Sequence, residues 1–349
     1  MEQLAHAGIE VIVGAARFKS RNVILIRLQD GEEKEIITDK VIIASGSVPI
    51  FPQNLKPDAD RIIAPRLLGK MREIPASIIV IGGGVTGSEM IYLFNQLGTN
   101  VTAVTDVPTL LPRADAKVSE ALEMALKSRG VIFHKNKRAA SAENLGDHVK
   151  VTLEDGTELV ADMAFVAIGR RPDVDGLHLA NIELSTQSGI AVDAQCRTTI
   201  DGLFAAGDVT GAPMTANRAM AMARIAARNA LSDHQQSYNE NLTVEAVYTD
   251  PEVAQVGDAS GVNAEIYAAD FETNLKANIA NSKNGFIKLF VHEHDHRIVG
   301  ASAIGSHVSD ILFSVAVAIA SDMTLADFQQ VVPANPTLSE VFVDLKRVE

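Results

Sequence analysis

The residues with the clearest chemical meaning form the glycine-rich segment Gly82-Gly83-Gly84-Val85-Thr86-Gly87. It follows the apolar run Ile78–Ile81 and precedes a stretch with the pattern of a helix. Glycines at this spacing let the chain turn tightly at Gly82, let a pyrophosphate approach the backbone at Gly84, and let the helix pack closely on the strand at Gly87. The segment therefore predicts a dinucleotide site, with a plain strand-to-helix turn as the alternative interpretation.

An acidic residue, Asp106, lies 19 residues after Gly87, where the next expected strand ends. An acid at this place accepts hydrogen bonds from the adenine ribose of NAD, whereas NADP sites have an arginine there for the additional phosphate. The first basic residue after Asp106 is Arg113. The sequence therefore predicts a preference for NAD. The alternatives are NADP as the coenzyme and an ordinary turn residue at this position.

The elements that must position these residues are predicted by alternating strand and helix patterns, which indicate a parallel sheet with helices on its faces. Helices are expected at Ser88–Leu97 and Lys117–Arg129, each closed by a glycine that caps its C-terminus. The proline-rich stretch Pro49–Pro75 is expected to be a connector. Further helices are expected near Ala216–Ala230 and at Ser309–Ala320, single strands at Glu10–Val13, Val23–Leu28, Glu35–Thr38, Val41–Ala44, Ile78–Ile81, Asn100–Val104, Val131–His134 and Leu203–Ala206, and hairpins at Val149–Leu153 with Glu158–Ala161 and at Phe286–Val291 with Arg297–Ile304.

Composition and charge exclude several classes of protein. The 349 residues contain 31 basic and 44 acidic side chains, and the resulting net charge of −13 makes nucleic acid and anionic membranes unfavourable partners. The longest apolar run, Ile311–Ala320, has about half of the ~20 residues that a membrane span needs. The single cysteine, Cys196, cannot form an internal disulfide, and the first residues lack the pattern of a signal peptide. We expect a cytoplasmic protein that binds neither nucleic acid nor membranes.

A second motif, Leu203–Asp208, is an apolar strand that ends in Gly-Asp, where a carboxylate can accept hydrogen bonds from a polyol. Together with Val41–Pro49 and Phe165–Pro172, it resembles the pyridine nucleotide–disulfide oxidoreductases. These are the class I flavoprotein disulfide reductases, which include dihydrolipoamide dehydrogenase, mercuric reductase and soluble transhydrogenase. The resemblance extends from about Gly8 to Glu340. It implies a dihydrolipoamide dehydrogenase-like oxidoreductase that uses FAD and NAD(P) and forms a homodimer.

The resemblance also implies an α/β fold. A Rossmann-like NAD(P)-binding domain would be inserted in an incomplete FAD-binding domain and followed by an α+β dimerisation domain. The expected boundaries are residues 1–72 for the first segment of the FAD-binding domain, 73–171 for the NAD(P)-binding domain, 172–238 for the second FAD-binding segment and 239–349 for the dimerisation domain.

Carried over position by position, the resemblance assigns two groups of binding residues. The nicotinamide dinucleotide would be held by Gly82, Gly84, Gly87, Asp106, Gly169 and Arg170, with Glu89 near both the nicotinamide and the flavin. FAD would be held by Asp208 at its ribityl chain, Ala216 facing its ring, and Ser45, Gly46 and Ala15 nearby.

The chain departs from the pattern of this family in ways that bear on catalysis. The unit that binds the ADP half of FAD and the redox-active cysteine pair after it are expected to be absent, since only nine residues precede Glu10 and Cys196 lies in another segment. Asn335 stands where the family has an acid/base histidine, with Glu340 at the position of the carboxylate that orients it. No intact catalytic residue is therefore expected, because asparagine does not exchange a proton near neutral pH. We expect FAD binding to be weak, or to depend on another chain that supplies the absent unit.

Two functions follow as expectations. The first is hydride transfer from NAD(P)H to flavin and on to an external acceptor, without disulfide reduction. The second is a non-catalytic module that binds NAD and dimerises, or a fragment of a longer flavoenzyme. No metal site is expected at His292, His294 and His296, because a hairpin tip separates these side chains. The basic run His134–Arg138 is expected to be a solvated loop, with contact to a nucleotide phosphate as the alternative.

Overall fold

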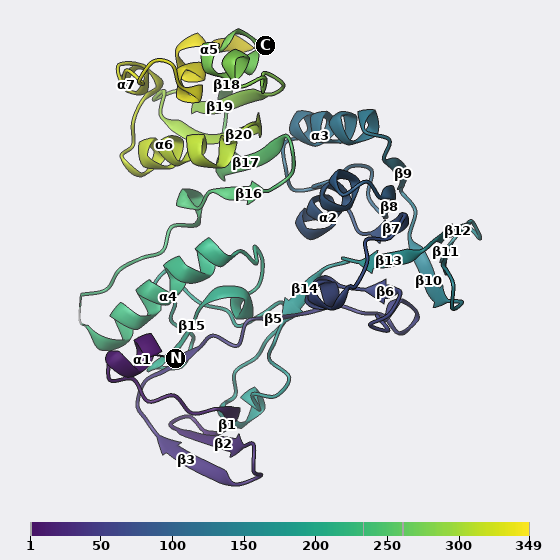
Figure 1. Ribbon diagram of the computed structural model, residues 1–349. Coiled ribbons are helices and arrows are strands. Elements are labelled where there is room, and N and C mark those ends of the chain that lie inside the picture. Colours follow the sequence, from purple (N-terminus) through teal and green to yellow (C-terminus); the bar gives the residue numbers. More distant parts are fainter. Residues whose placement is uncertain (1, 233, 260–261, 349) are drawn as a thin grey trace. The chain divides into compact units, whose positions relative to one another are not determined.

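The computed structural model describes residues 2–232, 234–259 and 262–348, and the chain divides into two compact units (Figure 1). Unit 1 contains residues 1–48 and 170–239, and unit 2 contains residues 49–169 and 240–349. Each unit therefore combines two segments that are distant in sequence. The finer division into four segments, with boundaries after residues 72, 171 and 238, stays a prediction.

Unit 1 contains a three-stranded antiparallel sheet, a parallel pair of strands and one long helix. The alanine-rich sequence of the helix favours helical structure and leaves a smooth apolar face. From this face Met222 and Ala226 are buried in a cluster with Phe204 and Cys196. The elements are α1 (Glu2–His6), β1 (Gly14–Ser20), β2 (Val23–Leu28), β3 (Glu33–Ile37), β4 (Val41–Ile43), η3 (Leu179–Ile182), β15 (Leu203–Ala205), η4 (Gly207–Thr210) and α4 (Ala216–Leu231). A pair of short strands, β5 (Ser47–Pro49) and β14 (Arg170–Pro172), lies at the two points where the chain passes between the units.

The first half of unit 2 is built on a parallel sheet with the strand order β6-β13-β7-β8-β9. Ile78 and Val80 are buried with residues of α2 and α3, whereas Ile79 and Ile81 are buried with residues of the β10-β11-β12 sheet. Because β7 is covered on both faces, its sequence is continuously apolar. The elements are η1 (Gln53–Leu55), β6 (Ile62–Ile63), η2 (Pro65–Lys70), β7 (Ser77–Ile81), α2 (Val85–Gln96), β8 (Asn100–Thr105), α3 (Ala116–Ser128), β9 (Ile132–Lys135), β10 (Ala139–Asn144), β11 (Val149–Leu153), β12 (Glu158–Ala161) and β13 (Met163–Val166).

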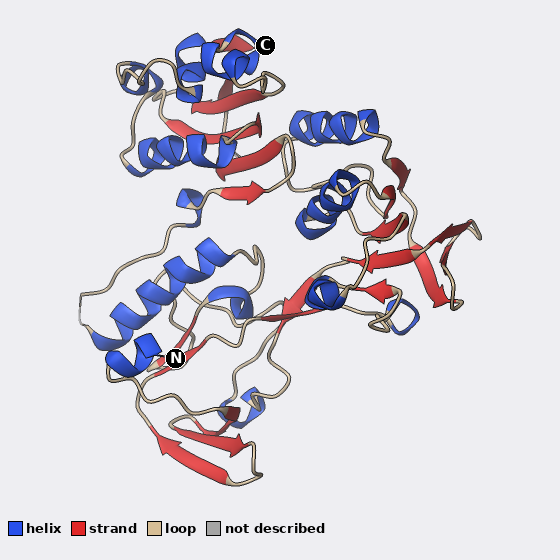
Figure 2. Cartoon of the chain, viewed as in Figure 1, coloured by secondary structure: helices blue, strands red, loops and turns tan. Residues whose placement is uncertain are grey.

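The second half of unit 2 is an antiparallel sheet with the strand order β16-β17-β20-β19-β18-β21. Helix α6 packs on β17 and β20 (Figure 2). It buries Leu312 and Val315 in one cluster with Leu289. Within the described parts of the chain, no helix is long and apolar enough to cross a membrane. The elements are η5 (Glu240–Leu242), β16 (Glu245–Val247), β17 (Glu252–Gly257), β18 (Ala264–Asp270), η6 (Phe271–Thr273), α5 (Leu275–Ile279), β19 (Phe286–His292), β20 (Ile298–Gly305), α6 (Val308–Ala320), α7 (Leu325–Gln329), η7 (Leu338–Asp344) and β21 (Lys346–Val348).

Several expected elements are confirmed. The hairpin of β11 and β12 has the predicted bounds, and the hairpin of β19 and β20 differs from its prediction by one residue at several ends. Gly98 and Gly130 follow α2 and α3 with φ values of +86° and +89°, as expected of glycines that end helices. Helix α2 begins at Val85, three residues before the expected start.

Two expectations about local structure are wrong. Residues 10–13 are not a strand, and β1 begins at Gly14, so that Ala15 lies within a strand opposite Arg27 rather than in a loop. Val11 and Val13 are exposed, whereas Phe18 in β1 is buried, so the apolar alternation of residues 10–13 does not correspond to a core face. The stretch Pro49–Pro75 is not only a connector, because it contains β6, which pairs in parallel with β13.

Candidate functional site

The glycine turn between β7 and α2 has room for a ligand at one glycine and none at two others. A Cβ atom on Gly82 would lie 2.2 Å from the carbonyl oxygen of Ala167, and one on Gly87 would lie 1.9 Å from the carbonyl oxygen of Gly82. A Cβ atom on Gly84 would meet no atom within 4 Å. Gly84 is also the N-cap of α2, and no side chain of the described residues caps this helix start. The backbone at Gly84 is therefore open to an anionic group at a helix N-terminus.

Asp106 follows β8 and forms an ion pair with Arg138, with 3.2 Å between Oδ2 and Nη2. Both side chains are more than half exposed. Arg113, the first base after Asp106 in sequence, instead lies 3.7 Å from Glu245. The sequence placed Arg138 in a basic run and the structure brings it to the acid, because the chain returns beside β8 through β9. A basic side chain, that of Arg138, therefore lies at the predicted ribose site, although Arg138 is 32 positions from Asp106 in sequence.

The loop between Asp106 and α3 is attached to the glycine turn. The amide of Leu111 donates to the carbonyl oxygen of Gly83 at 2.8 Å, and the amide of Leu110 donates to Glu123 Oε1 at 2.9 Å. The Glu123 carboxylate is buried and also accepts a hydrogen bond from Lys135 Nζ at 2.8 Å. No motif in the sequence indicates Glu123; its signal is a carboxylate on the apolar face of an expected helix.

Glu89 and Gly169, both expected at the nicotinamide dinucleotide, lie in unit 2 with the glycine turn. Glu89 Oε1 accepts a hydrogen bond at 3.0 Å from the amide of Tyr248, which follows β16. Gly169 is exposed, has a φ of +125°, and accepts a hydrogen bond from the amide of Ile50 at 3.0 Å. The contact of Glu89 thus connects α2 to the turn between β16 and β17 of the antiparallel sheet.

Asp208, in η4 directly after β15, is half-buried and accepts a hydrogen bond from Ser47 Oγ at 2.6 Å. Arg170 binds the same serine twice, through Nε to Oγ at 2.8 Å and through Nη2 to the carbonyl oxygen at 2.7 Å. The family resemblance places Arg170 in the loop over the nicotinamide dinucleotide, and no pattern in the sequence indicates Ser47. The side chain of Arg170 is engaged with Ser47 in unit 1, and its assignment to that loop stays a prediction.

The other residues expected near FAD have separate local roles. Ser45 Oγ donates to the carbonyl oxygen of Asp173 at 2.6 Å, and the carbonyl oxygen of Gly46 accepts from the amide of Asp173 at 3.0 Å. Ala216 is the first residue of α4. Ala15 is exposed in β1. The structure therefore joins Ser45 and Gly46 through Asp173, while Asp208 is joined to Ser47.

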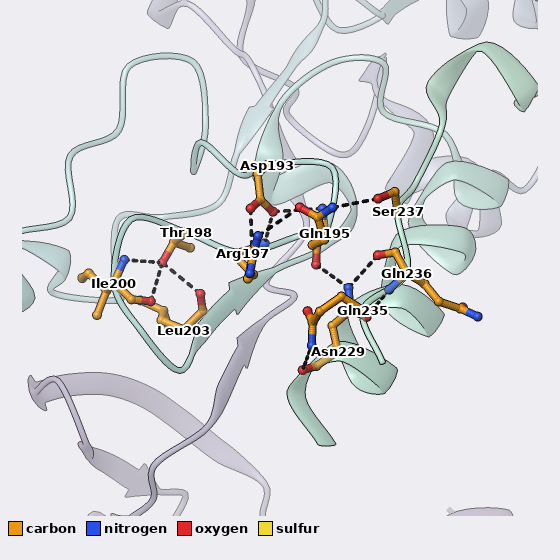
Figure 3. A network of polar contacts seen from close by, with 10 residues as sticks. All are labelled: Asp193, Gln195, Arg197, Thr198, Ile200, Leu203, Asn229, Gln235, Gln236 and Ser237. Carbon is orange, nitrogen blue, oxygen red and sulfur yellow. Dashed lines mark hydrogen bonds and ion pairs between the residues drawn. The ribbon is translucent and has the colours of Figure 1, made fainter. Parts of the chain in front are cut away.

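A polar network fixes the end of unit 1 (Figure 3). Asn229 of α4 donates to the carbonyl oxygens of Gln195 and Gln236, and Arg197 Nε donates to Asp193 Oδ2 at 2.9 Å. Cys196 lies between Asp193 and Arg197 in sequence and is buried. Burial, together with the negative charge of Asp193, raises the pKa of the Cys196 thiol to about 11. A thiol with this pKa is not a reactive nucleophile near neutral pH.

Asn335 and Glu340 are joined directly. Asn335 Nδ2 donates to Glu340 Oε1 at 2.6 Å, and Glu340 Oε2 accepts from the amide of Thr337 at 2.8 Å as part of a capping box. The hydrogen bonds from Thr337 and Asn335 hold the pKa of the Glu340 carboxyl below its usual value. Near neutral pH an ionised carboxylate and an amide face each other, so neither side chain can deliver and retrieve a proton.

The histidine-rich tip of the β19–β20 hairpin has no metal-like arrangement. His292 pairs with Asp295 at 2.9 Å, and its ring centroid lies 5.7 Å from that of His294. In the part of the chain that the structure describes, no group of three or more His, Cys, Asp or Glu side chains is placed to hold a metal ion.

The described residues fit two kinds of group. The open backbone of Gly84 at a helix start fits a pyrophosphate, and the half-buried carboxylate of Asp208 fits hydroxyl donors. The first group of residues lies in unit 2 and the second in unit 1.

Two family models match the chain. The model of the pyridine nucleotide-disulphide oxidoreductase family matches residues 2–223, and the model of the dimerisation domain of that family matches residues 243–346. Among curated proteins, an NAD(P)H dehydrogenase (quinone) from Mycobacterium tuberculosis is 32% identical over 99% of this chain and 73% of its own length. A dihydrolipoyl dehydrogenase from Geobacillus stearothermophilus is 33% identical over 97% of this chain and 74% of its own length.

Solved structures give the same result. The crystal structure of LpdA from Mycobacterium tuberculosis superposes with a TM-score of 0.92 at 30% identity, covering 98% of this chain and 78% of that protein. The flavoprotein disulfide reductase RclA from Escherichia coli superposes with a TM-score of 0.88 at 23% identity, over 99% of this chain and 80% of that one, which shows a common fold.

Proposed function

The chain belongs to the pyridine nucleotide-disulphide oxidoreductase family and is an FAD- and NAD(P)-dependent oxidoreductase, and on this basis we propose that it oxidises NADH without reducing a disulfide. When bound, FAD accepts a hydride from a reduced nicotinamide and passes two electrons to an acceptor. The proposed acceptor takes these electrons without a dithiol intermediate.

The observation that favours this function most is the hydrogen bond of 2.6 Å from Asn335 to Glu340. A dithiol relay needs a thiolate nucleophile and a group that exchanges its proton. The amide of Asn335 does not titrate near neutral pH, and its hydrogen bond leaves Glu340 with a structural partner instead of an imidazole. The buried Cys196, with a pKa of about 11, does not substitute for a reactive thiol.

A quinone is the acceptor class that we propose. The mycobacterial relative with this name, NAD(P)H dehydrogenase (quinone), aligns over 99% of the chain. A quinone accepts electrons directly from a reduced flavin, so its reduction does not need the acid/base group that Asn335 replaces.

The residues of the chain have binding and orienting roles in this proposal. The helix start at Gly84 would hold the pyrophosphate of the nicotinamide dinucleotide between Gly82 and Gly87, and Asp106 would accept hydrogen bonds from its adenine ribose. Asp208 would accept hydrogen bonds from the ribityl chain of FAD. The remaining proposed contacts are Glu89, Gly169 and Arg170 for the nicotinamide dinucleotide and Ser45, Gly46, Ala15 and Ala216 for FAD.

The assembly is also part of the proposal. The match of residues 243–346 to a dimerisation domain supports a homodimer. A separate chain that completes the FAD site and a cytoplasmic location stay proposals that follow from the composition and the family pattern.

Variants of Asn335 test this function. Asn335→Ala should leave NADH-dependent quinone reduction within a few-fold of the original rate, because no proton passes through the amide. Asn335→His should not create lipoamide reduction, since the buried Cys196 does not supply a reactive thiolate for the new imidazole. A loss of quinone reduction by about 10²-fold or more in Asn335→Ala, the size expected for removal of an acid/base group, would contradict the proposal.

A further inference from the structure

Three side chains in unit 1 form a hydrogen-bonded chain that ends at Asp208. Arg170 donates to Ser47 through Nε and Nη2, at 2.8 Å to Oγ and 2.7 Å to the carbonyl oxygen. Ser47 Oγ in turn donates to Asp208 Oδ2 at 2.6 Å. The contacts connect β14, β5 and η4, three short elements that are far apart in sequence.

The direction of these hydrogen bonds is fixed by chemistry. A guanidinium group has only donors, so the hydroxyl oxygen of Ser47 must accept from Arg170. A serine hydroxyl has one proton, and this proton is then directed at Asp208. Without Arg170, the hydroxyl would be free to rotate and donate elsewhere.

Burial makes the arrangement rigid. Ser47 is 6% exposed, so its hydroxyl has little access to water as an alternative partner. Asp208 lies in η4 next to Gly207, where an added Cβ atom would lie 3.0 Å from Ala219 of α4. One oxygen of the Asp208 carboxylate is therefore fixed by Ser47, and the orientation of the other is fixed with it.

We infer that Arg170 and Ser47 are positioning residues that orient the Asp208 carboxylate for the hydroxyl groups of a bound polyol. The inference rests on the proposed function, in which that polyol is the ribityl chain of FAD. A carboxylate that is already oriented binds hydroxyl donors without first losing rotational freedom, and this raises affinity.

Affinity for FAD tests the inference. The variants Ser47→Ala and Arg170→Ala should each bind FAD about tenfold more weakly, as expected for loss of a hydrogen bond to a charged group. The double variant should also bind FAD about tenfold more weakly than the original chain, and not about a hundredfold, because both residues act through the same contact. Arg170→Lys should recover part of the affinity, since an ammonium can donate to one of the two serine oxygens but lacks the paired donors.

The chain offers matched controls. Arg171 is the next residue and forms an exposed ion pair with Asp175 at 2.5 Å. Arg171→Ala should leave FAD affinity unchanged. NADH affinity should also be unchanged in Ser47→Ala, because Ser47 lies in unit 1 and the glycine turn lies in unit 2.

A modified ligand distinguishes positioning from general support of the fold. The test uses FAD analogues that each lack one ribityl hydroxyl. The analogue without the hydroxyl that contacts Asp208 should bind the original chain more weakly than FAD does. In Ser47→Ala and Arg170→Ala this difference should shrink, because the carboxylate is no longer oriented. A merely structural effect would weaken FAD and the analogue equally.

The outcomes separate the inference from the proposed function. If the original chain binds FAD and the Ser47 and Arg170 variants bind it equally well, or if their losses add in the double variant, the inference is wrong and the proposed function stands. If the original chain binds no FAD in equilibrium dialysis, both are wrong.

Discussion

Asp106 and Arg138 form an exposed ion pair at the predicted ribose site, and their charges have opposite effects on a 2′-phosphate. An exposed pair contributes at most about 1 kcal/mol, so Arg138 can leave Asp106 at little cost. We predict that Asp106→Ala weakens NADH binding and tightens NADPH binding, each by roughly threefold. Titration of both reduced coenzymes by fluorescence measures the change.

Arg138→Ala is the matched variant for this prediction. It should weaken NADPH binding and leave NADH binding nearly unchanged, because it removes the guanidinium beside Asp106 that would attract the additional phosphate. A preference of the original chain for NADPH would show that Asp106 does not select the coenzyme.

A second prediction at the residue scale concerns Cys196. With a pKa of about 11, about a thousandth of the thiol is ionised at pH 8. We predict that maleimide labels native Cys196 at least about 100-fold more slowly than the unfolded chain, whose thiol has a pKa of about 8.5. The native rate should rise with pH up to about 11, since the thiolate is the reacting form. Rapid labelling of the native chain at pH 8, followed by mass spectrometry, would contradict the buried position.

At the scale of elements, the β7–α2 turn contains one glycine expected to matter for NADH binding, Gly84, and another expected to matter for stability, Gly87. Gly84→Leu should abolish detectable NADH binding but leave the melting temperature nearly unchanged, because its side chain enters open space. Gly87→Ala should lower the stability by about 1–3 kcal/mol, because its Cβ atom would lie 1.9 Å from a backbone oxygen. Thermal unfolding and NADH titration of both variants measure the two effects. Tight NADH binding by Gly84→Leu would show that the pyrophosphate does not approach this residue.

An element could be predicted from the sequence where its apolar residues are the ones that the fold buries. The hairpin β11–β12 could be predicted with its bounds, because Val149, Val151 and Leu153 alternate with partly exposed residues around a Gly-containing turn. Strand β1 could not, because Phe18 is its single buried side chain. Strand β6 has two residues and is defined by its pairing with β13, which a local pattern does not reveal.

The candidate site was predictable where it is continuous in sequence and not where it depends on folding. The glycine motif and the Gly-Asp motif are local and could be found directly. The contacts of Asp106 with Arg138 and of Asp208 with Ser47 join residues 32 and 161 positions apart, so no spacing rule indicates them. The connection of Asn335 to Glu340 spans five residues and was accessible through the family pattern alone.

At the scale of the whole molecule, we predict a homodimer formed through residues 242–349. Phe313 and Val317 lie one turn apart on α6 and are 66% and 48% exposed. Burial of these side chains by a second copy would stabilise a dimer, and the net charge of −13 opposes it weakly, since salt screens charges beyond ~8 Å. Sedimentation at micromolar concentration should show a dimer for the original chain and a shift towards monomer for Phe313→Asp.

Val160→Asp is the control for this experiment, because Val160 is similarly exposed but lies on β12. It should leave the dimer intact. A monomeric original chain would contradict the homodimer, and equal dissociation of both variants would contradict the role of α6.

In the proposed function, electrons from NADH leave the protein without passing through a disulfide. The most direct measurement compares NADH oxidation at pH 7 by the FAD-loaded protein with menadione, a quinone, and with lipoamide, a disulfide, as alternative acceptors. We expect menadione to support NADH oxidation and lipoamide to support none. Lipoamide-dependent NADH oxidation at a rate comparable to that with menadione would contradict the proposed function.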